Sequence, residues 1–193
     1  MPPENSQPTT HNRQQGFWNE LLKLVLLAIL VVVPFRLYIA QPFIVDGPSM
    51  FPTFDNGHYL IIDEISYRLR EPARGEVIVF KYPRDPDKYF IKRIIGLPGE
   101  TVMINNGQVT IINEENTEGF ALAESYVKHP KNDSFRVVLS ESEYFVMGDN
   151  RASSSDSRVW GPLPRGNIVG RPVIRFLPPA LMPGDYSFAQ SDA

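Results

Sequence analysis

Hydrophobic and polar residues follow three different patterns along the chain. Residues 1–16 are polar, rich in Pro, Asn, Gln and Thr, and lack apolar periodicity, which predicts a disordered tail. Residues 17–40 form an almost continuous apolar run. In residues 41–183, short apolar runs alternate with Pro, Gly, Asn and Asp, which indicates a β domain. Residues 184–193 are predicted to form a second tail.

The apolar run is predicted to be a single membrane-spanning helix. The twelve uncharged residues between Lys23 and Arg36 give only about 18 Å of helix, against a hydrocarbon core of about 30 Å. Because long basic side chains can reach the headgroups, the helix can be counted from Leu21 to Tyr38, which gives about 27 Å. A cleaved secretory signal and a buried core helix are the alternatives. We favour the anchor because Pro42 disfavours cleavage just before it and because the run is apolar on all sides.

Positive charges around the run predict its orientation. Arg13 and Lys23 lie on its N-terminal side, whereas on the other side only Arg36 counts before Arg68. Cytoplasmic flanks carry the excess of Lys and Arg. We therefore expect the N-terminus in the cytoplasm and the large domain on the extracytoplasmic side.

The β domain is predicted to be an antiparallel barrel or sandwich, because its strands are short and its turns frequent. Asn105-Asn106-Gly107 has the composition of a tight hairpin turn, and Glu64–Leu69 that of a short helical turn. Residues 113–134 are polar and predict a small flap, part of an insertion at about residues 101–143. The predicted strands are Phe43–Val45, His58–Asp63, Glu76–Lys81, Tyr89–Ile95, Thr101–Ile104, Gln108–Ile112, Phe135–Leu139, Glu143–Met147 and Ile168–Phe176.

Composition excludes several classes of function. The chain of 193 residues has no cysteine, which excludes thiol catalysis, disulfides and thiolate metal sites. Its formal charge of −3 gives no support to nucleic-acid binding. The cluster after Asp149 does not fit a calcium loop, because Arg151 stands where a third-position oxygen ligand belongs. We expect neither a metal nor a small-molecule cofactor.

Four segments carry candidate chemistry, and two of them precede residue 81. Ser49 follows Gly47 and Pro48 just after a predicted strand, in a turn that can expose its hydroxyl and leave its backbone N–H free. Gly-Pro-Ser is also common in purely structural turns. Segment Arg74–Phe80 is a turn that leads into a buried strand, and alone it predicts core packing.

The third segment, Tyr89–Glu100, places a lysine in an apolar strand. Strand alternation puts Lys92 between Phe90 and Ile94 on one face and Arg93 on the other. Burial lowers a lysine pKa by up to about 3–5 units, which makes the amine usable as a base near neutral pH. The alternative is an ordinary edge-strand lysine whose amine reaches solvent.

The fourth segment, Met147–Pro162, is dense in short hydrogen-bonding side chains. Such side chains tie their own backbone into rigid turns. A flexible surface loop is the alternative for this segment taken alone.

Taken together and in order, these segments resemble the motif set of type I signal peptidases. The matching motifs are Ser-Met-x-Pro-Thr, Arg-Gly-acid-Val-Ile-Val-Phe, Ile-Lys-Arg-x-Ile-Gly-Leu-Pro-Gly-acid and Gly-Asp-Asn-Arg-x-x-Ser-x-Asp-Ser-Arg. The resemblance covers residues 41–176 and extends to the short N-terminal anchor. It implies a serine endopeptidase in which Ser49 attacks the scissile carbonyl and Lys92 takes its proton.

The resemblance also implies roles for neighbouring residues. Ser154 would orient Lys92, and the Ser49 backbone N–H would meet the oxyanion, while Gly47 stands where some members carry a second, hydroxyl donor. The residues expected to brace the fourth segment are Asp149, Asn150, Arg151, Asp156 and Arg158, the last two as an ion pair. The residues that match pocket-lining positions are Phe43, Val45, Met50, Phe54, Val79, Phe90 and Ile91.

Substrates and location follow from the resemblance as well. The implied substrates are exported preproteins, cut after small residues at the −3 and −1 positions, which bind by strand addition. The implied location is the lipid bilayer of a plasma or thylakoid membrane. The ending Arg-Phe-Leu-Pro-Pro looks like that of cyanobacterial or thylakoid-type members.

Other readings of the sequence remain open. Segment Ser125–Lys128 fits the Ser-x-x-Lys of penicillin-binding enzymes, but that motif needs a helix start and partner motifs that the chain lacks. His58 and His129 would allow a Ser-His mechanism, although neither stands in a recognisable arrangement. A Ser/Lys self-processing peptidase and a non-catalytic, membrane-tethered β module are further alternatives.

Overall fold

The computed structural model describes residues 11–38, 40–177 and 179–182. The chain divides into two units, with the boundary between residues 39 and 40. The parts of the predicted tails at residues 1–10 and 184–193 lie outside the described residues.

Helix α1 (His11–Tyr38) forms the first unit. The apolar run is helical as predicted, but the helix begins at His11, inside the predicted tail. Residues 11–15 contain no proline, and a helix gains one hydrogen bond for each residue that it adds. Within the part of the chain that the structure describes, no helix is long and apolar enough to cross a membrane, so the spanning anchor is not confirmed.

The second unit is built from short antiparallel strands, as the alternating pattern predicted. Three two-residue strands, at residues 120–121, 163–164 and 180–181, were not predicted, because two residues are too few to show a period. The strands are β1 (Ala40–Ile44), β2 (Tyr59–Asp63), β3 (Val77–Tyr82), β4 (Asp85–Gly96), β5 (Thr101–Asn105), β6 (Gln108–Ile112), β7 (Phe120–Ala121), β8 (Phe135–Val138), β9 (Glu143–Met147), β10 (Leu163–Pro164), β11 (Ile168–Leu177) and β12 (Ala180–Leu181). The short helices are α2 (Ser66–Leu69), η1 (Arg151–Ser153), α3 (Ser157–Trp160) and η2 (Arg165–Asn167).

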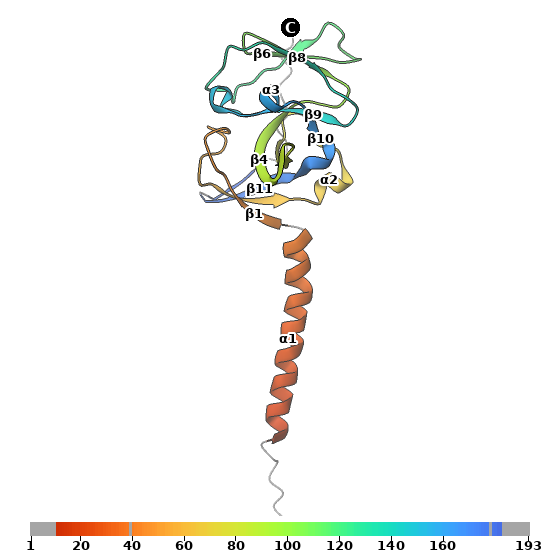
Figure 1. Cartoon of the computed structure of the whole chain (residues 1–193). Helices are drawn as coiled ribbons and strands as arrows, with labels where there is room; N and C mark the ends of the chain where they lie inside the picture. Colours follow the sequence, from red (N-terminus) through yellow and green to blue (C-terminus); the bar gives the residue numbers. More distant parts are fainter. Residues whose placement is uncertain (1–10, 39, 178, 183–193) are drawn as a thin grey trace, which may run out of the picture. The chain divides into compact units, whose positions relative to one another are not determined.

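These strands form two sheets. The larger has the order β1-β2-β11-β3-β4-β9-β10, with β12 paired to β11, and the smaller has the order β7-β6-β5-β8. Figure 1 shows β6 and β8 at one end of this unit and β1 at the other. Both orders are open paths, so the described strands form two antiparallel sheets rather than the closed barrel allowed by the prediction.

The insertion predicted at residues 101–143 corresponds to the smaller sheet and its loops. Its β5–β6 hairpin turns at Asn106 and Gly107, whose φ angles are 48° and 83°. Asn and Gly tolerate positive φ at both central positions of a type I′ turn, which is why the composition located this hairpin.

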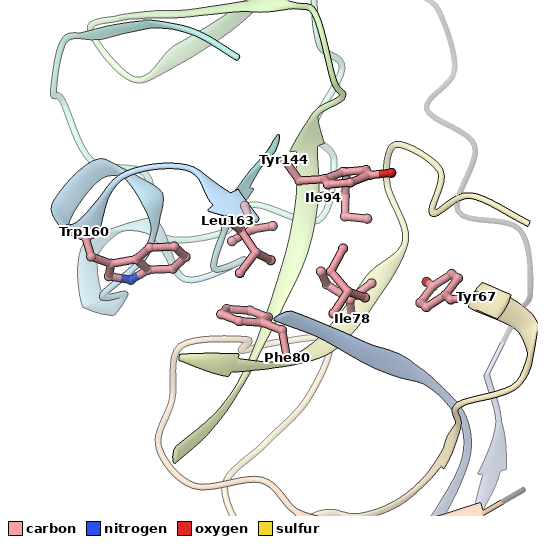
Figure 2. Close-up of a cluster of buried hydrophobic side chains, with 9 residues drawn as sticks. Tyr67, Ile78, Phe80, Ile94, Tyr144, Trp160 and Leu163 are labelled. Atoms are coloured by element: carbon pink, nitrogen blue, oxygen red, sulfur yellow. The ribbon is translucent and has the colours of Figure 1, made fainter. Parts of the chain in front are cut away.

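Three apolar clusters make up the core of this unit. One packs α2 and α3 against the larger sheet, and Figure 2 shows Trp160 and Leu163 facing Phe80 while Ile78 and Ile94 fill the centre. A second lies under the smaller sheet, and a third lies beneath the loop between β1 and β2. The third cluster supports the loop that carries Ser49, because its members Met50 and Phe54 come from that loop.

Gly96 is the last residue of β4, where the chain leaves the larger sheet before it enters β5 of the smaller one. A Cβ at this position would lie 2.4 Å from Val102 Cγ2 and 2.8 Å from Leu139 Cδ1. Both neighbours belong to the cluster under the smaller sheet. A glycine is therefore needed here for close packing, and the same strand carries Lys92 four residues earlier.

We expect Gly96→Ala to lower the free energy of unfolding by about 1–3 kcal/mol, because the added methyl overpacks a closed core. The measurement is the urea midpoint of the purified protein. Gly166→Ala is the matched control, because a Cβ there meets nothing within 4 Å. Equal midpoints for the two variants would contradict this account of the packing.

Candidate active site

Ser49 lies in the loop between β1 and β2, and this loop is fixed at both of its flanks. The Gly47 N–H donates to Asn56 Oδ1 at 2.8 Å, and the φ of 88° at Gly47 turns the chain toward Ser49. The carbonyl of Ser49 accepts from the Asn150 N–H at 3.0 Å, and the carbonyl of Pro48 accepts from Asn150 Nδ2 at 3.2 Å. The serine is thus held against the fourth candidate segment.

Lys92 stands on β4 opposite Ile78 of β3 and is only 4% exposed. Its Nζ lies 2.8 Å from Ser49 Oγ and 2.8 Å from the carbonyl oxygen of Ile91. The distance of about 3 Å that a serine–lysine pair requires is therefore met. Two side chains separated by 43 positions in the sequence are in hydrogen-bonding contact.

Burial sets the protonation of this amine. Desolvation lowers the pKa of Lys92 to about 8, while the carboxylates of Asp156 and Asp149 oppose the shift. A neutral amine has a lone pair that can accept the hydroxyl proton of Ser49, whereas an ammonium can only donate. The site therefore holds a base that is partly neutral at mildly alkaline pH, next to the hydroxyl that it would deprotonate.

The two carboxylates near Lys92 are each neutralised by an arginine. Arg158 donates to Asp156 from Nε and from Nη2, both at 2.8 Å, so the predicted ion pair is present. Arg93 donates to Asp149 from Nε at 2.8 Å and from Nη2 at 2.6 Å. Because both charges are paired, the electrostatic opposition to a neutral Lys92 is reduced.

Ser154 is not placed as the sequence suggested. Its Oγ is buried and does not bond Lys92, whereas its hydroxyl helps to lower the pKa of the neighbouring Asp156. Lys92 Nζ is instead engaged by Ser49 Oγ and by the Ile91 carbonyl of its own strand. The expected bond from Ser154 to Lys92 is therefore not made in this structure, and the orienting role of Ser154 stays a prediction.

Gly148 allows the fourth segment to approach the serine loop. A Cβ at Gly148 would lie 2.3 Å from Ser154 Oγ and 2.4 Å from the carbonyl oxygen of Ser49. Any larger residue would push Ser49 away from Lys92, so the glycine is required by this close approach.

The Ser49 backbone N–H donates to none of the described residues and is free to meet an oxyanion. The N–H of Gly47 is already used by Asn56, so Gly47 supplies neither a hydroxyl nor a free amide as a second donor.

A cavity of about 490 Å³ opens beside the Ser49–Lys92 pair. Five of the predicted pocket residues line it, namely Phe43, Val45, Val79, Phe90 and Ile91. Met50 and Phe54 are not among its lining residues and pack in the cluster beneath the serine loop, so the pocket role predicted for them is not confirmed. The lining residues that were not predicted are Ile44, Asp46, Leu60, Lys88, Tyr89 and Ser155.

Two charged partners of the fourth segment were not predicted. Arg151 pairs with Glu124, and Arg158 also donates to Asp133 at 2.8 Å. Both acids lie in the predicted flap. The flap has no periodic pattern of apolar residues, so nothing in the sequence indicated these ion pairs. Among the described residues, no group of three or more His, Asp or Glu residues could hold a metal.

Comparison with known proteins gives the family. A profile described as signal peptidase, peptidase S26, matches residues 18–177 of the chain. The chain belongs to this family. A probable signal peptidase I-1 of Synechocystis is 37% identical over 84% of each chain, and a signal peptidase I of Leptolyngbya laminosa is 38% identical over 82% of this chain and 79% of its own.

Relatives of lower identity come from a plant and from another bacterium. Thylakoidal processing peptidase 1 of Arabidopsis thaliana is 32% identical over 92% of this chain and 56% of its own. The crystal structure of a signal peptidase I from Enterococcus faecalis is 30% identical, covers 53% of this chain and 97% of its own, and has a TM-score of 0.46.

The rival Ser-x-x-Lys motif lacks the structure that it requires. Residues 125–128 are turn and bend rather than the start of a helix, and both Ser125 and Lys128 are exposed. The histidines are engaged elsewhere: His58 Nδ1 accepts from the Asp55 N–H at 3.0 Å, and the ring of His129 lies 5.7 Å from that of Phe51. Ser49 Oγ is in contact with Lys92 instead.

A stability measurement tests the burial of Lys92. Its pKa of about 8 in the folded state is below the ordinary 10.5, so folding is penalised below pH 8 and the penalty is relieved as the pH rises toward 10.5. We expect Lys92→Met to raise the free energy of unfolding by up to about 3 kcal/mol at pH 7. The gain should shrink toward pH 10.

Denaturant unfolding at pH 7 and pH 10 provides the measurement. Lys81→Met is the control, because Lys81 is exposed on the neighbouring strand β3 and its replacement should have little effect at either pH. A Lys92→Met effect that does not depend on pH would mean that the amine is hydrated.

Proposed function

We propose that this protein is a serine endopeptidase that cleaves N-terminal signal peptides from exported preproteins, with Ser49 as nucleophile and Lys92 as general base. The observation that carries the proposal is the 2.8 Å contact between the buried Lys92 amine and Ser49 Oγ beside a largely apolar cavity. Membership of the signal peptidase family supports it independently. A non-catalytic β module would have no need to bury a lysine against a serine.

The chemistry follows the general logic of a nucleophile with an adjacent base. Neutral Lys92 takes the proton of Ser49 Oγ as that oxygen attacks the scissile carbonyl, and the oxyanion meets the Ser49 backbone N–H. Lys92 then returns the proton to the leaving amine, which frees the mature chain and leaves the signal peptide as an ester on Ser49. A water attacks the ester while Lys92 accepts its proton, and proton return restores the serine hydroxyl.

An extended peptide is the substrate form that fits the cavity. Strand β1 is at the end of the larger sheet, and residues 85–92 of β4 pair with β3 but with no other described strand. Both strands line the cavity, so each offers backbone groups to an added strand. The apolar lining by Phe43, Val79 and Ile91 supports a preference for small apolar residues at −3 and −1.

We also propose that the enzyme works at a membrane, with its N-terminus in the cytoplasm and the β unit on the extracytoplasmic side. Support comes from the apolar run of residues 21–38 and the charges flanking it. The plant relative is named a thylakoidal enzyme, which suggests a plasma or thylakoid membrane here. Holding enzyme and preprotein in one bilayer raises their effective concentration.

Replacing either member of the pair tests the catalytic assignment. We expect Ser49→Ala and Lys92→Ala each to lower kcat for a preprotein by at least about 1,000-fold, because nucleophile and base act as a unit. The measurement is preprotein cleavage in detergent, with circular dichroism to show that both variants fold. Ser125→Ala and Lys128→Ala form the matched control and should cleave normally. Cleavage retained without Ser49 or Lys92 would refute the assignment.

Alkaline carbonate extraction of cell membranes tests the location. The native chain should remain with the membrane pellet, whereas Leu27→Asp should be partly released, because a charge in the bilayer centre costs about 2.5–3.5 kcal/mol. Protease added from the extracytoplasmic side should digest the β unit of the native protein. Full release of the native chain by carbonate would contradict the membrane proposal.

A further inference from the structure

The loop of residues 122–134, which joins β7 to β8, returns from the smaller sheet to the surroundings of the Ser49–Lys92 pair. Its His129 carbonyl accepts from the Ala152 N–H at 3.2 Å, and its Asp133 accepts from Arg158 at 2.8 Å. We call this segment the bracing loop. It touches the fourth candidate segment at both of these points.

The ring of Tyr126 in this loop covers a buried ion pair. The guanidinium carbon of Arg93 lies 4.1 Å from the centroid of the Tyr126 ring. Arg93 is 3% exposed and binds Asp149, which is fully buried, through two hydrogen bonds. A cation stacked on an aromatic face is attracted to it, and more strongly where water is excluded. The ring therefore helps to keep this ion pair dry.

The hydroxyl of Tyr126 extends the network to a second ion pair. It donates to Glu124 Oε1 at 2.8 Å. Glu124 accepts from Arg151 Nη1 at 3.0 Å and also from Arg151 Nη2. Arg151 in turn donates from Nε to the carbonyl of Gly148 at 3.1 Å. These contacts form a network, which we call the Tyr126 network. It starts at Asp149 and ends at the neighbouring Gly148, and its members are Asp149, Arg93, Tyr126, Glu124, Arg151 and Gly148.

The Tyr126 network is connected to both Ser49 and Lys92 through neighbouring residues. Arg93 directly follows Lys92 on β4, and Asp149 Oδ2 accepts from Thr53 Oγ1 at 2.5 Å, in the loop that carries Ser49. The backbone of Asn150, the next residue, holds the Ser49 carbonyl. A shift of the Tyr126 network would therefore move Ser49 and Lys92 relative to each other.

We propose that Tyr126 is a positioning residue of the enzyme, and that with Glu124 it clamps the Lys92 strand and the turn at residues 148–150 in the geometry that joins Ser49 to Lys92. The proposal rests on the proposed function, because it assigns these two residues a part in the same site. It also gives the smaller sheet a role, since that sheet presents the bracing loop to the site.

The expected kinetic signature is a fall in kcat with little change in KM. No residue of the bracing loop lines the cavity that would hold the peptide, so substrate contacts remain when Tyr126 is altered. A reacting pair displaced by about 1 Å can lose on the order of 100-fold in rate. We expect Tyr126→Leu to lower kcat about tenfold or more.

The pH dependence should shift in a defined direction. The charges that face Lys92 are Asp149 and Asp156, with Arg93 and Arg158 bound to them and the Glu124–Arg151 pair behind. Removal of the Tyr126 aromatic ring admits water to the buried ion pair and weakens the contact of Arg93 with Asp149. Both effects favour the ammonium, so the pKa of Lys92 rises and the ascending limb of the rate profile moves to higher pH.

The experiment measures kcat, KM and the pH–rate profile of the full-length enzyme in detergent. It compares Tyr126→Leu, which removes the ring, with Tyr126→Phe, which keeps the ring over Arg93 but loses the bond to Glu124. We expect Tyr126→Phe to recover most of the rate. Tyr67→Leu is the matched control, because Tyr67 also lies over an arginine, Arg70 at 5.2 Å, and donates to that arginine's partner Glu76.

Tyr67 contributes to a different cavity, so its loss should lower stability without moving the pH profile. The positioning role is overturned if Tyr126→Leu keeps the native kcat, or if it and Tyr67→Leu shift the profile equally. Either result leaves the Ser49 and Lys92 assignments standing. If the native enzyme does not cleave preproteins, the proposed function fails.

In that case, titration of the Lys92 amine by ¹⁵N NMR still tests the positioning role of Tyr126. A higher pKa of Lys92 in Tyr126→Leu than in the native protein supports the positioning role. An unchanged pKa overturns it.

Discussion

The contact between the buried amine of Lys92 and the hydroxyl of Ser49 is the constraint on which the rest of the site depends. An amine this deeply buried is costly when charged, and that cost is what makes it available as a base. Two carboxylates stand close enough to stabilise the charged form, and each is bound by an arginine. Burial therefore outweighs their attraction and lowers the pKa of the amine.

The structure brings this pair together from segments that are far apart in the chain. Close approach at Gly148 lets the fourth segment hold the Ser49 carbonyl, and close approach at Gly96 lets the end of β4 pack against the core of the smaller sheet. The smaller sheet, in turn, carries the bracing loop whose acids bind Arg151 and Arg158. A protein arranged in this way gives up stability at Lys92, and in the proposed mechanism it gains a base in return.

Local patterns were sufficient to predict much of this arrangement, and the limits are physical. Period-two alternation located the long strands, and the Asn106-Gly107 turn was predictable because few residues tolerate positive φ. Ser49 and Lys92 were identified only through their resemblance to a family, since neither is distinctive alone. Met50 and Phe54 were predicted to line the pocket but pack in the core cluster, because an apolar side chain near a nucleophile can face either one and the sequence does not state which.

Long-range pairing explains the other errors. The bond from Lys92 to the Ile91 carbonyl was not predicted, because a sequence motif carries no information on backbone carbonyls. Glu124 and Tyr126 gave no signal because their partners Arg151 and Arg93 lie 27 and 33 positions away in sequence. Such contacts depend on the tertiary fold.

The most direct test of the central claim is the titration of the Lys92 amine in the native protein by ¹⁵N NMR, assigned with Lys92→Met. The account predicts a pKa near 8, well below the ordinary 10.5. A Lys92 that titrates with the exposed lysines, near 10.5, would contradict the claim that burial prepares it to deprotonate Ser49.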